Sequence, residues 1–158
     1  RRAAVSVNGV AVDMEGRLDR RYLVLARTWQ PGDRITLELD MPVEQIHAHP
    51  DVAQDVNCVA LQRGPLVYCL EAVDQVAPLH RIRLAADAAL TPQFEGELLG
   101  GVVTLAGQAL AADAAGWENV LYRAAAPALT PITVRAIPYY AWDNRAAGAM
   151  TVWLPVAG

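Results

Sequence analysis

Lysine is absent from this chain of 158 residues, which carries 13 arginines, 17 acidic residues and a formal net charge of −4. A mildly acidic chain with scattered arginines offers no basic patch for nucleic acid and no cationic segment for an anionic membrane. No apolar run approaches the roughly 20 residues that span a bilayer. We therefore expect no nucleic-acid partner and no membrane partner.

The start of the chain lacks both an initiator methionine and the apolar core of a signal peptide, because the sequence begins Arg1-Arg2. We expect a piece of a longer protein or a processed product. The length allows one domain or two small ones. Motifs for a Ser-His-Asp arrangement, a glycine-rich phosphate loop and a spaced Cys/His cluster are also absent from the sequence.

Cysteine is scarce, with only Cys58 and Cys69 in the sequence. The two lie symmetrically about Arg63-Gly64, so a tight hairpin would place them opposite each other and close enough for a disulfide. A corner would instead separate them, and the usual burial of free cysteine favours two small buried residues. Cys69 has no evident activating base in the sequence, which argues against a thiolate nucleophile.

Strand signals dominate the rest of the chain. Asn8-Gly9 between two valine-rich runs predicts a hairpin. Strict alternation over residues 35–41 predicts an antiparallel strand with Ile35, Leu37, Leu39 and Met41 facing the core. Arg63-Gly64-Pro65 predicts two strands that meet at a corner.

Many short strands at intervals of roughly 8–12 residues indicate an all-β fold, specifically an antiparallel β-sandwich. Composition becomes rich in alanine and proline after Val73. This shift predicts two packed sub-modules, residues 1–73 and residues 74–158, which either share a sheet or exchange strands.

His47 and His49 are the candidates for a metal site. Residues two apart on a strand point to the same face, so both imidazoles are able to approach one ion. A catalytic zinc site needs at least one further ligand, and Asp51 lies beyond Pro50, which ends the strand. Hydrogen-bonded or solvent-facing structural histidines are the favoured interpretation.

Tyr139-Tyr140-Ala141-Trp142 is the densest aromatic group. Strand periodicity places Tyr140 and Trp142 on one face and Tyr139 on the other. These two are our candidate substrate-binding residues, because exposed aromatic rings stack on sugars; core packing is the favoured alternative. The turn 143–145 that follows carries polar groups suited to docking onto another domain.

Several ordered segments give the chain a family likeness. It resembles the C-terminal β-sandwich region of family 127 glycoside hydrolases, which are β-L-arabinofuranosidase-like enzymes, and the likeness covers nearly the whole chain. The matching segments are Tyr22-Leu23, Trp29, Gly32-Asp33, Met41-Pro42-Val43, Ala48-His49-Pro50, residues 59–71 and residues 137–145.

The resemblance implies that the catalytic machinery lies outside this chain. Enzymes of this family have an (α/α)6 barrel that holds the nucleophilic cysteine, the zinc ligands and the acid/base carboxylate, and no position here matches those motifs. The resemblance implies that zinc binds in the barrel and that this chain binds no cofactor. It also implies that the partner of this chain is the catalytic barrel of the same protein. Cys58 stands where the family more often has a basic residue, which argues against an inherited disulfide.

Glycosidases need two facing carboxylates, which lie about 5–5.5 Å apart in retaining enzymes and about 6.5–9.5 Å apart in inverting ones. No pair in this sequence has a convergent setting, so no catalytic residue is assigned among Glu38, Asp40, Glu44, Glu71, Glu95 and Glu97.

Three functions follow as expectations. The first is a non-catalytic fragment that braces the barrel or mediates homodimerisation. The second is an autonomous module that binds plant-type arabinose-containing glycans through Tyr140 and Trp142. The third, a metal enzyme on a cupin-like sandwich, requires His47 and His49 to converge with a third ligand.

Overall fold

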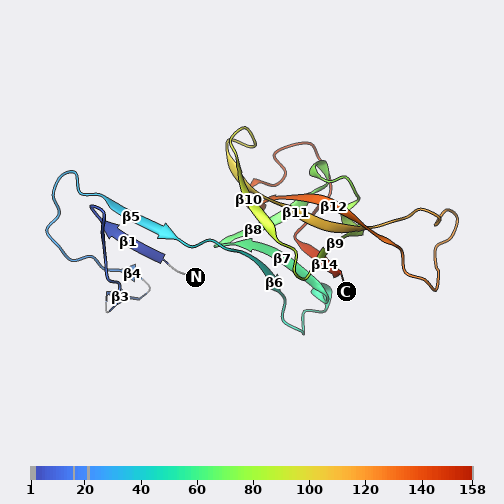
Figure 1. The fold of residues 1–158 in the computed structure, drawn as a ribbon, viewed down its shortest axis with the longest axis horizontal. Helices are drawn as coiled ribbons and strands as arrows, with labels where there is room; N and C mark the ends of the chain where they lie inside the picture. Colours follow the sequence, from blue (N-terminus) through green and yellow to red (C-terminus); the bar gives the residue numbers. More distant parts are fainter. Residues whose placement is uncertain (1–2, 16, 21, 158) are drawn as a thin grey trace. The chain divides into compact units, whose positions relative to one another are not determined.

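The computed structural model describes residues 3–15, 17–20 and 22–157, and their regular structure consists of strands and short 3-10 helices. Among these residues no helix has the length and apolar character needed to cross a membrane. The chain forms two compact units, Arg1–Pro42 and Val43–Gly158 (Figure 1). The predicted all-β class is confirmed.

The described residues of the first unit form five short strands in two sheets. The order β2-β1-β5 makes a three-stranded antiparallel sheet, and β3 pairs with β4 in a second, two-stranded sheet. The strands are β1 (Ala3–Val7), β2 (Val10–Ala11), β3 (Leu18–Asp19), β4 (Tyr22–Leu23) and β5 (Ile35–Leu39).

The predicted hairpin at Asn8-Gly9 is confirmed. Both residues have positive φ, 53° and 79°, which a type I′ turn requires and which Asn and Gly tolerate best. The Asn8 side chain donates to Asp33 Oδ1 at 2.7 Å and accepts from the Arg34 amide at 2.8 Å. These two bonds attach the hairpin to the turn that precedes β5.

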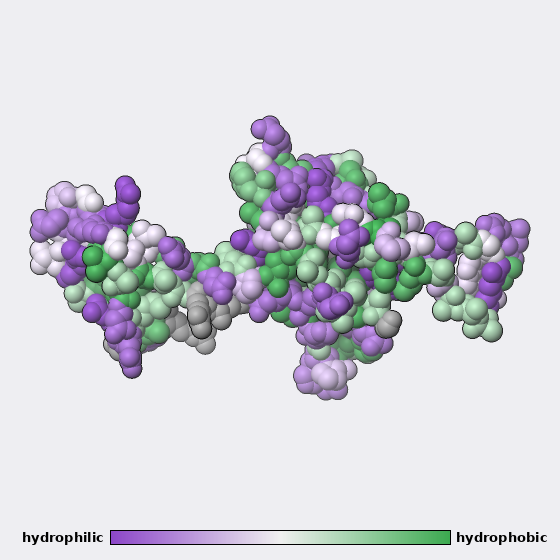
Figure 2. All heavy atoms as spheres, viewed as in Figure 1, coloured by the Kyte–Doolittle hydropathy of each residue, from purple (hydrophilic) through white to green (hydrophobic). Residues whose placement is uncertain are grey.

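Strand β5 forms where the alternating pattern predicts it, but the expected burial of its apolar face is wrong. Ile35, Leu37 and Leu39 are 53%, 58% and 57% exposed. Their neighbours on β1, Val5 and Val7, are buried, so the cover within the described residues of the first unit lies over β1 and not over β5. In Figure 2 green apolar residues lie among purple polar ones on the surface of this unit, at the left.

The second unit contains the remaining nine strands and four 3-10 helices. The strands are β6 (Val43–His47), β7 (Cys58–Arg63), β8 (Leu66–Glu71), β9 (Ile82–Ala85), β10 (Leu90–Glu95), β11 (Val102–Ala112), β12 (Leu129–Pro138), β13 (Met150–Thr151) and β14 (Trp153–Ala157). The 3-10 helices are η1 (Ala53–Asp55), η2 (Ala72–Asp74), η3 (Leu79–Arg81) and η4 (Tyr139–Ala141).

Six of these strands close into a ring. The order β8-β12-β11-β9-β14-β7 returns to β8 through the β7–β8 pairing (Figure 1). All pairs are antiparallel except β9–β14, in which Val156 lies beside Leu84. The sandwich predicted from the sequence is thus a barrel-like closed sheet in this unit, and closure removes exposed edges from its member strands.

The interior of the ring is apolar. The longest strands, β11 and β12, pair over eight residue positions and contribute inward-facing side chains at alternate positions. The largest fully buried aliphatic and aromatic side chains of this core are Val59, Leu61, Tyr68, Leu70, Ile82, Leu84, Leu105, Val134 and Leu154.

The segment Arg63-Gly64-Pro65 is a tight turn whose strands soon separate. Gly64 has φ 57°, and a positive φ followed by proline suits a type II′ turn. Strands β7 and β8 pair only at Gln62–Val67 and Arg63–Leu66. Beyond that point β7 pairs with β14 and β8 with β12. In place of the predicted corner, the segment thus forms a tight hairpin turn whose strands separate after two residue pairs.

The division into units differs from the boundary that the composition predicts after Val73. Strands β7 and β8 belong to the closed ring and pair with β12 and β14, which follow much later in the chain. The change in composition coincides with η2 and the loop after it, so it marks a connection within the second unit. The contacts place the boundary after Pro42.

Candidate functional site

Charged side chains converge at one end of β8 in the second unit. Arg145 Nη1 donates to Asp74 Oδ1 at 2.9 Å, and Arg145 also binds Glu71. Arg135, from β12, binds Asp74 and donates to Glu95 Oε2 at 3.0 Å. We call Glu71, Asp74, Glu95, Arg135 and Arg145 the arginine–carboxylate cluster.

Asp74 is the member of the cluster that is most clearly held in its ionised form. Burial alone would raise the pKa of Asp74, but hydrogen bonds from Arg145 and Arg135 outweigh it and keep that pKa below its ordinary value. The hydrogen bond to Asp74 raises the pKa of Arg145. Because Asp74 stays ionised and faces two guanidinium groups, it cross-links the fold and has no proton to exchange near neutral pH.

The sequence contains these five residues but gives no signal that they meet. Asp74 and Arg145 are 71 positions apart and come together only because η2 and the segment after η4 lie at the same end of the ring. The prediction that the turn 143–145 docks onto another domain is wrong for Arg145. Its guanidinium forms salt bridges with Glu71 and Asp74 of its own unit.

Four of the other carboxylates considered from the sequence can be placed within their own units. Glu38 and Asp40 are exposed on and just after β5, and Glu97 lies in the turn between β10 and β11. Glu95 accepts a hydrogen bond from Thr104 Oγ1 at 2.7 Å in addition to its contact with Arg135. Glu95 is thus part of the cluster, and the other three are exposed.

Both cysteines are free thiols. The turn is centred between Gly64 and Pro65, so the register extended from the hairpin would bring Ala60, not Cys58, opposite Cys69. In fact Cys58 pairs with Pro155 and Cys69 with Ile137. Burial raises the pKa of Cys69 to about 11, with a smaller contribution from Glu71. Cys69 is therefore a neutral core residue at physiological pH, as expected for a thiol without an activating base.

The two histidine candidates lie at the exposed end of β6. His47 is the last residue of the strand, and His49 Nδ1 accepts a hydrogen bond from the Asp51 amide at 3.2 Å. Within the described ranges, no three side chains of His, Cys, Asp or Glu gather closely enough to hold a metal ion. The third ligand that a zinc site needs is thus not supplied by this part of the chain.

The aromatic segment is a 3-10 helix and not a strand. Residues three apart lie above one another in such a helix, so Tyr139 stacks on Trp142 with ring centroids 6.0 Å apart and planes 20° apart. The prediction that Tyr139 faces away from Trp142 is therefore wrong. Tyr140 is 65% exposed, and Trp142 is partly exposed at 37%, so both candidate substrate-binding residues reach solvent.

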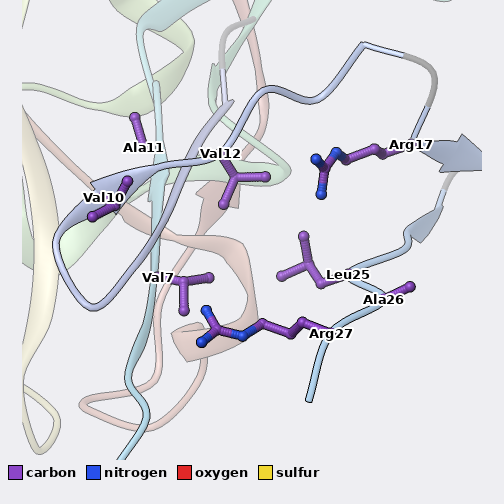
Figure 3. A pocket seen from close by; sticks show the side chains of 8 residues that line it. All are labelled: Val7, Val10, Ala11, Val12, Arg17, Leu25, Ala26 and Arg27. Carbon is purple, nitrogen blue, oxygen red and sulfur yellow. The ribbon is translucent and has the colours of Figure 1, made fainter. Parts of the chain in front are cut away.

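A small pocket of about 150 Å³ opens in the first unit. Figure 3 shows aliphatic side chains, among them Val7 and Leu25, with the guanidinium groups of Arg17 and Arg27 extending beside them. Arg27 lies over the Trp29 ring at 5.1 Å and 3.5 Å from Asp33 Oδ2. No carboxylate lines this pocket, so it does not supply the acid/base pair of a glycosidase.

A larger groove of about 570 Å³ lies in the second unit between η3, β13 and β14. Its walls are mainly apolar and include Leu79, Met150 and Trp153, with His80 as the titratable side chain. A single imidazole without a carboxylate partner does not make an acid/base pair.

Two family models together match almost the whole chain. Residues 43–155 match the glycoside hydrolase family 127 C-terminal domain, and residues 1–41 match the β-L-arabinofuranosidase GH127 middle domain. The junction between the two matches coincides with the division into units after Pro42.

Similar proteins agree with these matches. A non-reducing end β-L-arabinofuranosidase of Bifidobacterium longum is 44% identical over 141 residues, which are 84% of this chain and 20% of that protein. The crystal structure of a GH127 β-L-arabinofuranosidase from Geobacillus stearothermophilus T6 has a TM-score of 0.90 at 45% identity, covering 99% of this chain and 25% of that one.

A further solved structure, described as a GH127 β-arabinofuranosidase, has a TM-score of 0.84 at 33% identity and covers 99% of this chain and 23% of that one. The chain thus spans about a fifth to a quarter of the length of these relatives. From the family models and the agreement in fold, the chain belongs to glycoside hydrolase family 127, with residues 43–155 forming its C-terminal domain.

Proposed function

We propose that this chain is a non-catalytic accessory region of a β-L-arabinofuranosidase-like glycoside hydrolase, and that it braces the catalytic barrel or mediates dimerisation. The observation that carries the proposal is the arginine–carboxylate cluster. The side chains of Glu71 and Asp74 are only 6% and 2% exposed and bind Arg145. Both carboxylates are therefore engaged in buried contacts within the fold and are not available for acid/base chemistry on a sugar.

Exposed apolar side chains of the second unit support an interaction role. Phe94 on β10 is 73% exposed, and Leu121 and Tyr122 in the connection between β11 and β12 are 84% and 90% exposed. Leu121 and Tyr122 are neighbours in the chain, and adjacent exposed apolar side chains are typical of contacts with other proteins or domains. In the complete enzyme we expect such side chains to contact the barrel or a second subunit.

The zinc of the enzyme, in this proposal, is held entirely by residues outside the chain. Consistent with this, the described residues contain no group of three His, Cys, Asp or Glu side chains placed to hold a metal ion. When bound in a barrel, zinc supplies Lewis-acid character and holds a thiolate ligand deprotonated. Within this chain Cys69, with a raised pKa and a buried position, does not suit that role.

The accessory function is tested by dividing the full-length protein. Removing residues 1–158 from it is expected to lower its thermal midpoint or its oligomeric mass, and adding the separately produced chain is expected to restore the lost property. Thermal unfolding reports bracing, and sedimentation velocity reports dimerisation. Hydrolysis of a chromogenic β-L-arabinofuranoside by the 158-residue chain alone, or no effect of its removal on either property, would contradict the proposal.

A carbohydrate-binding module is the second candidate, and the stacked pair Tyr139–Trp142 with exposed Tyr140 favours it. Aromatic faces of this kind bind sugar rings. Calorimetric titration with plant-type arabinose-containing oligosaccharides, with and without zinc, tests this function. Saturable binding that is lost in Trp142→Ala and kept in Trp117→Ala would support it; no heat with any sugar would exclude it.

A further inference from the structure

The aromatic segment 139–142 is held at its first end by the folded core of the second unit. Pro138, the last residue of β12, pairs with Tyr68 of β8, and η4 starts at the next residue. Ala141 within η4 is 5% exposed and belongs to a small apolar cluster that includes Cys69. The backbone of the segment is therefore anchored on the core.

Glu71 holds the other end of the segment. The chain turns at Asp143, whose φ of 63° is positive, and the Asp143 amide donates to Glu71 Oε1 at 3.2 Å. Two residues later, Arg145 binds the second oxygen of Glu71 and donates to Asp74 Oδ1 at 2.9 Å. One buried carboxylate thus binds the chain at two points just after Trp142, and the guanidinium ties the same turn to η2.

The rings that this turn supports are open to solvent. Tyr139, Tyr140 and Trp142 are 46%, 65% and 37% exposed, and Tyr139 is stacked on Trp142. Exposed side chains lose rotamer freedom when a ligand binds to them, and this loss lowers affinity. A support that fixes the backbone beside Trp142 removes part of that cost before the ligand arrives.

The polar groups next to the rings indicate the class of ligand. Asp143 and Asn144 are both exposed. The Asn144 amide nitrogen donates to two carbonyl oxygens of the same turn, at 3.2 and 3.0 Å, which leaves its amide oxygen and the Asp143 carboxylate as acceptors. Acceptors beside an aromatic face suit the hydroxyl groups of a sugar. Because the Arg145 guanidinium is already bound to two carboxylates, while Asp143 adds a negative charge, an uncharged sugar is favoured over an acidic one.

Resting on the carbohydrate-binding function considered above, we propose that the segment 139–142 binds an uncharged sugar and that Glu71 and Arg145 are the positioning residues of this site. The rings stack on the C–H face of the sugar, and Asp143 and Asn144 accept hydrogen bonds from its hydroxyl groups. Glu71 and Arg145 do not touch the sugar. They act through the backbone that carries the rings.

Fluorine NMR tests the positioning role without any ligand. The chain has four tryptophans, and after labelling with 5-fluorotryptophan the signal that is lost in Trp142→Phe identifies this ring. Glu71→Gln is expected to broaden or shift that signal, because the side-chain amide has one acceptor oxygen for the Asp143 amide and Arg145 instead of two. Glu95→Gln is the matched control. Its carboxylate contacts the same cluster through Arg135 and binds Thr104, away from the segment, so the Trp142 signal is expected to stay unchanged.

Arg145→Lys keeps the test informative if Glu71→Gln fails to fold. Lysine keeps the positive charge beside both carboxylates, but one ammonium does not reproduce the rigid fork of donors of a guanidinium. The Trp142 signal is expected to broaden in this variant too. A signal as sharp as in the unmodified chain and at the same shift, in either folded variant, would overturn the positioning role.

Calorimetric titration tests the ligand class and the effect of the support on affinity. A neutral arabinose-containing oligosaccharide is expected to bind the unmodified chain about tenfold more tightly than an oligogalacturonate of equal length. Glu71→Gln is expected to weaken binding of the neutral sugar by about tenfold, through the cost of ordering freed side chains, and Glu95→Gln by less than about twofold.

The outcomes separate this inference from the function on which it rests. Tighter binding of the acidic sugar, or equal affinities of Glu71→Gln and Glu95→Gln for the neutral one, would overturn the inference and leave the carbohydrate-binding function standing. No binding of any sugar to the unmodified chain would refute that function itself, and the ligand class with it.

Discussion

The two units of this chain bury their β-sheets to different extents. In residues 43–158 six strands close into a ring, and its interior side chains are almost fully buried. In residues 3–42 a three-stranded sheet has only a partial cover, and its β5 side chains remain more than half exposed. Three strands need a packed apolar face to be stable alone, so the contrast indicates that only the second unit is self-sufficient.

Breaking the arginine–carboxylate cluster is expected to destabilise the second unit alone. Arg145→Ala leaves Asp74 and Glu71 buried without their shared partner, and removing one member of a buried ion pair costs about 3–5 kcal/mol. Urea unfolding followed by circular dichroism measures the change. Arg34→Ala, at an exposed side chain of the first unit, serves as the control, with an expected change within about 0.5 kcal/mol. Equal effects of the two substitutions would contradict the role of the cluster.

Truncating one leucine in each unit compares the two cores directly. Leu84 is fully buried in the ring and Leu37 is 58% exposed. We expect Leu84→Ala to lower the free energy of unfolding by about 2–5 kcal/mol and Leu37→Ala by less than about 1 kcal/mol. Chemical denaturation of the 158-residue chain provides both values. A large cost for Leu37→Ala in this chain would mean that the first unit already buries its own core.

Acid is expected to weaken the second unit through Asp74. Its folded pKa lies below the ordinary value of about 3.9, so its stabilising contribution is complete above that pH and is lost as the pH falls through the folded pKa. Asp74→Asn should lower stability at neutral pH and flatten the decline below about pH 5. Thermal unfolding across pH 3–7 checks this, with exposed Asp51→Asn as the control; an unchanged acid profile in Asp74→Asn would refute it.

The two thiols should differ in reactivity at pH 8. Cys58 is partly exposed, whereas Cys69 is buried with a pKa of about 11. Since the thiolate is the reacting species, a disulfide reagent is expected to modify Cys58 at least tenfold faster. Mass spectrometry of Cys58→Ser and Cys69→Ser variants assigns the two rates. Comparable rates would mean that the ring opens readily around Cys69.

Short sequence patterns predicted those elements whose conformation depends on residues close together in the chain. Asn8-Gly9 formed its hairpin because both residues tolerate positive φ, and alternation located β5. The burial of β5 was predicted wrongly, because alternation shows which side chains share a face but not whether a second layer covers it. The ring closure and the parallel β9–β14 pair depend on contacts between distant segments, which periodicity does not encode.

The candidate site shows the same limit. The sequence spacing of Glu71, Asp74 and Arg145 does not indicate that they meet. Their contact depends on where β8, η2 and the segment after η4 lie in the folded unit. The aromatic residues were recognised from composition, but the pairing of Tyr139 with Trp142 required knowing that the segment is a 3-10 helix. Family-like segments, by contrast, indicated the correct family because several of them occur in a fixed order.

Amide hydrogen exchange of the 158-residue chain, resolved by residue, tests the contrast between the units most directly. We expect the amides of β11 and β12 to exchange only through global unfolding of the second unit, and the paired amides of β1 and β5 to exchange at least a hundredfold faster through local opening. Protection of β1 and β5 equal to that of β11 and β12 would contradict the account, because the first unit would then be complete without further polypeptide.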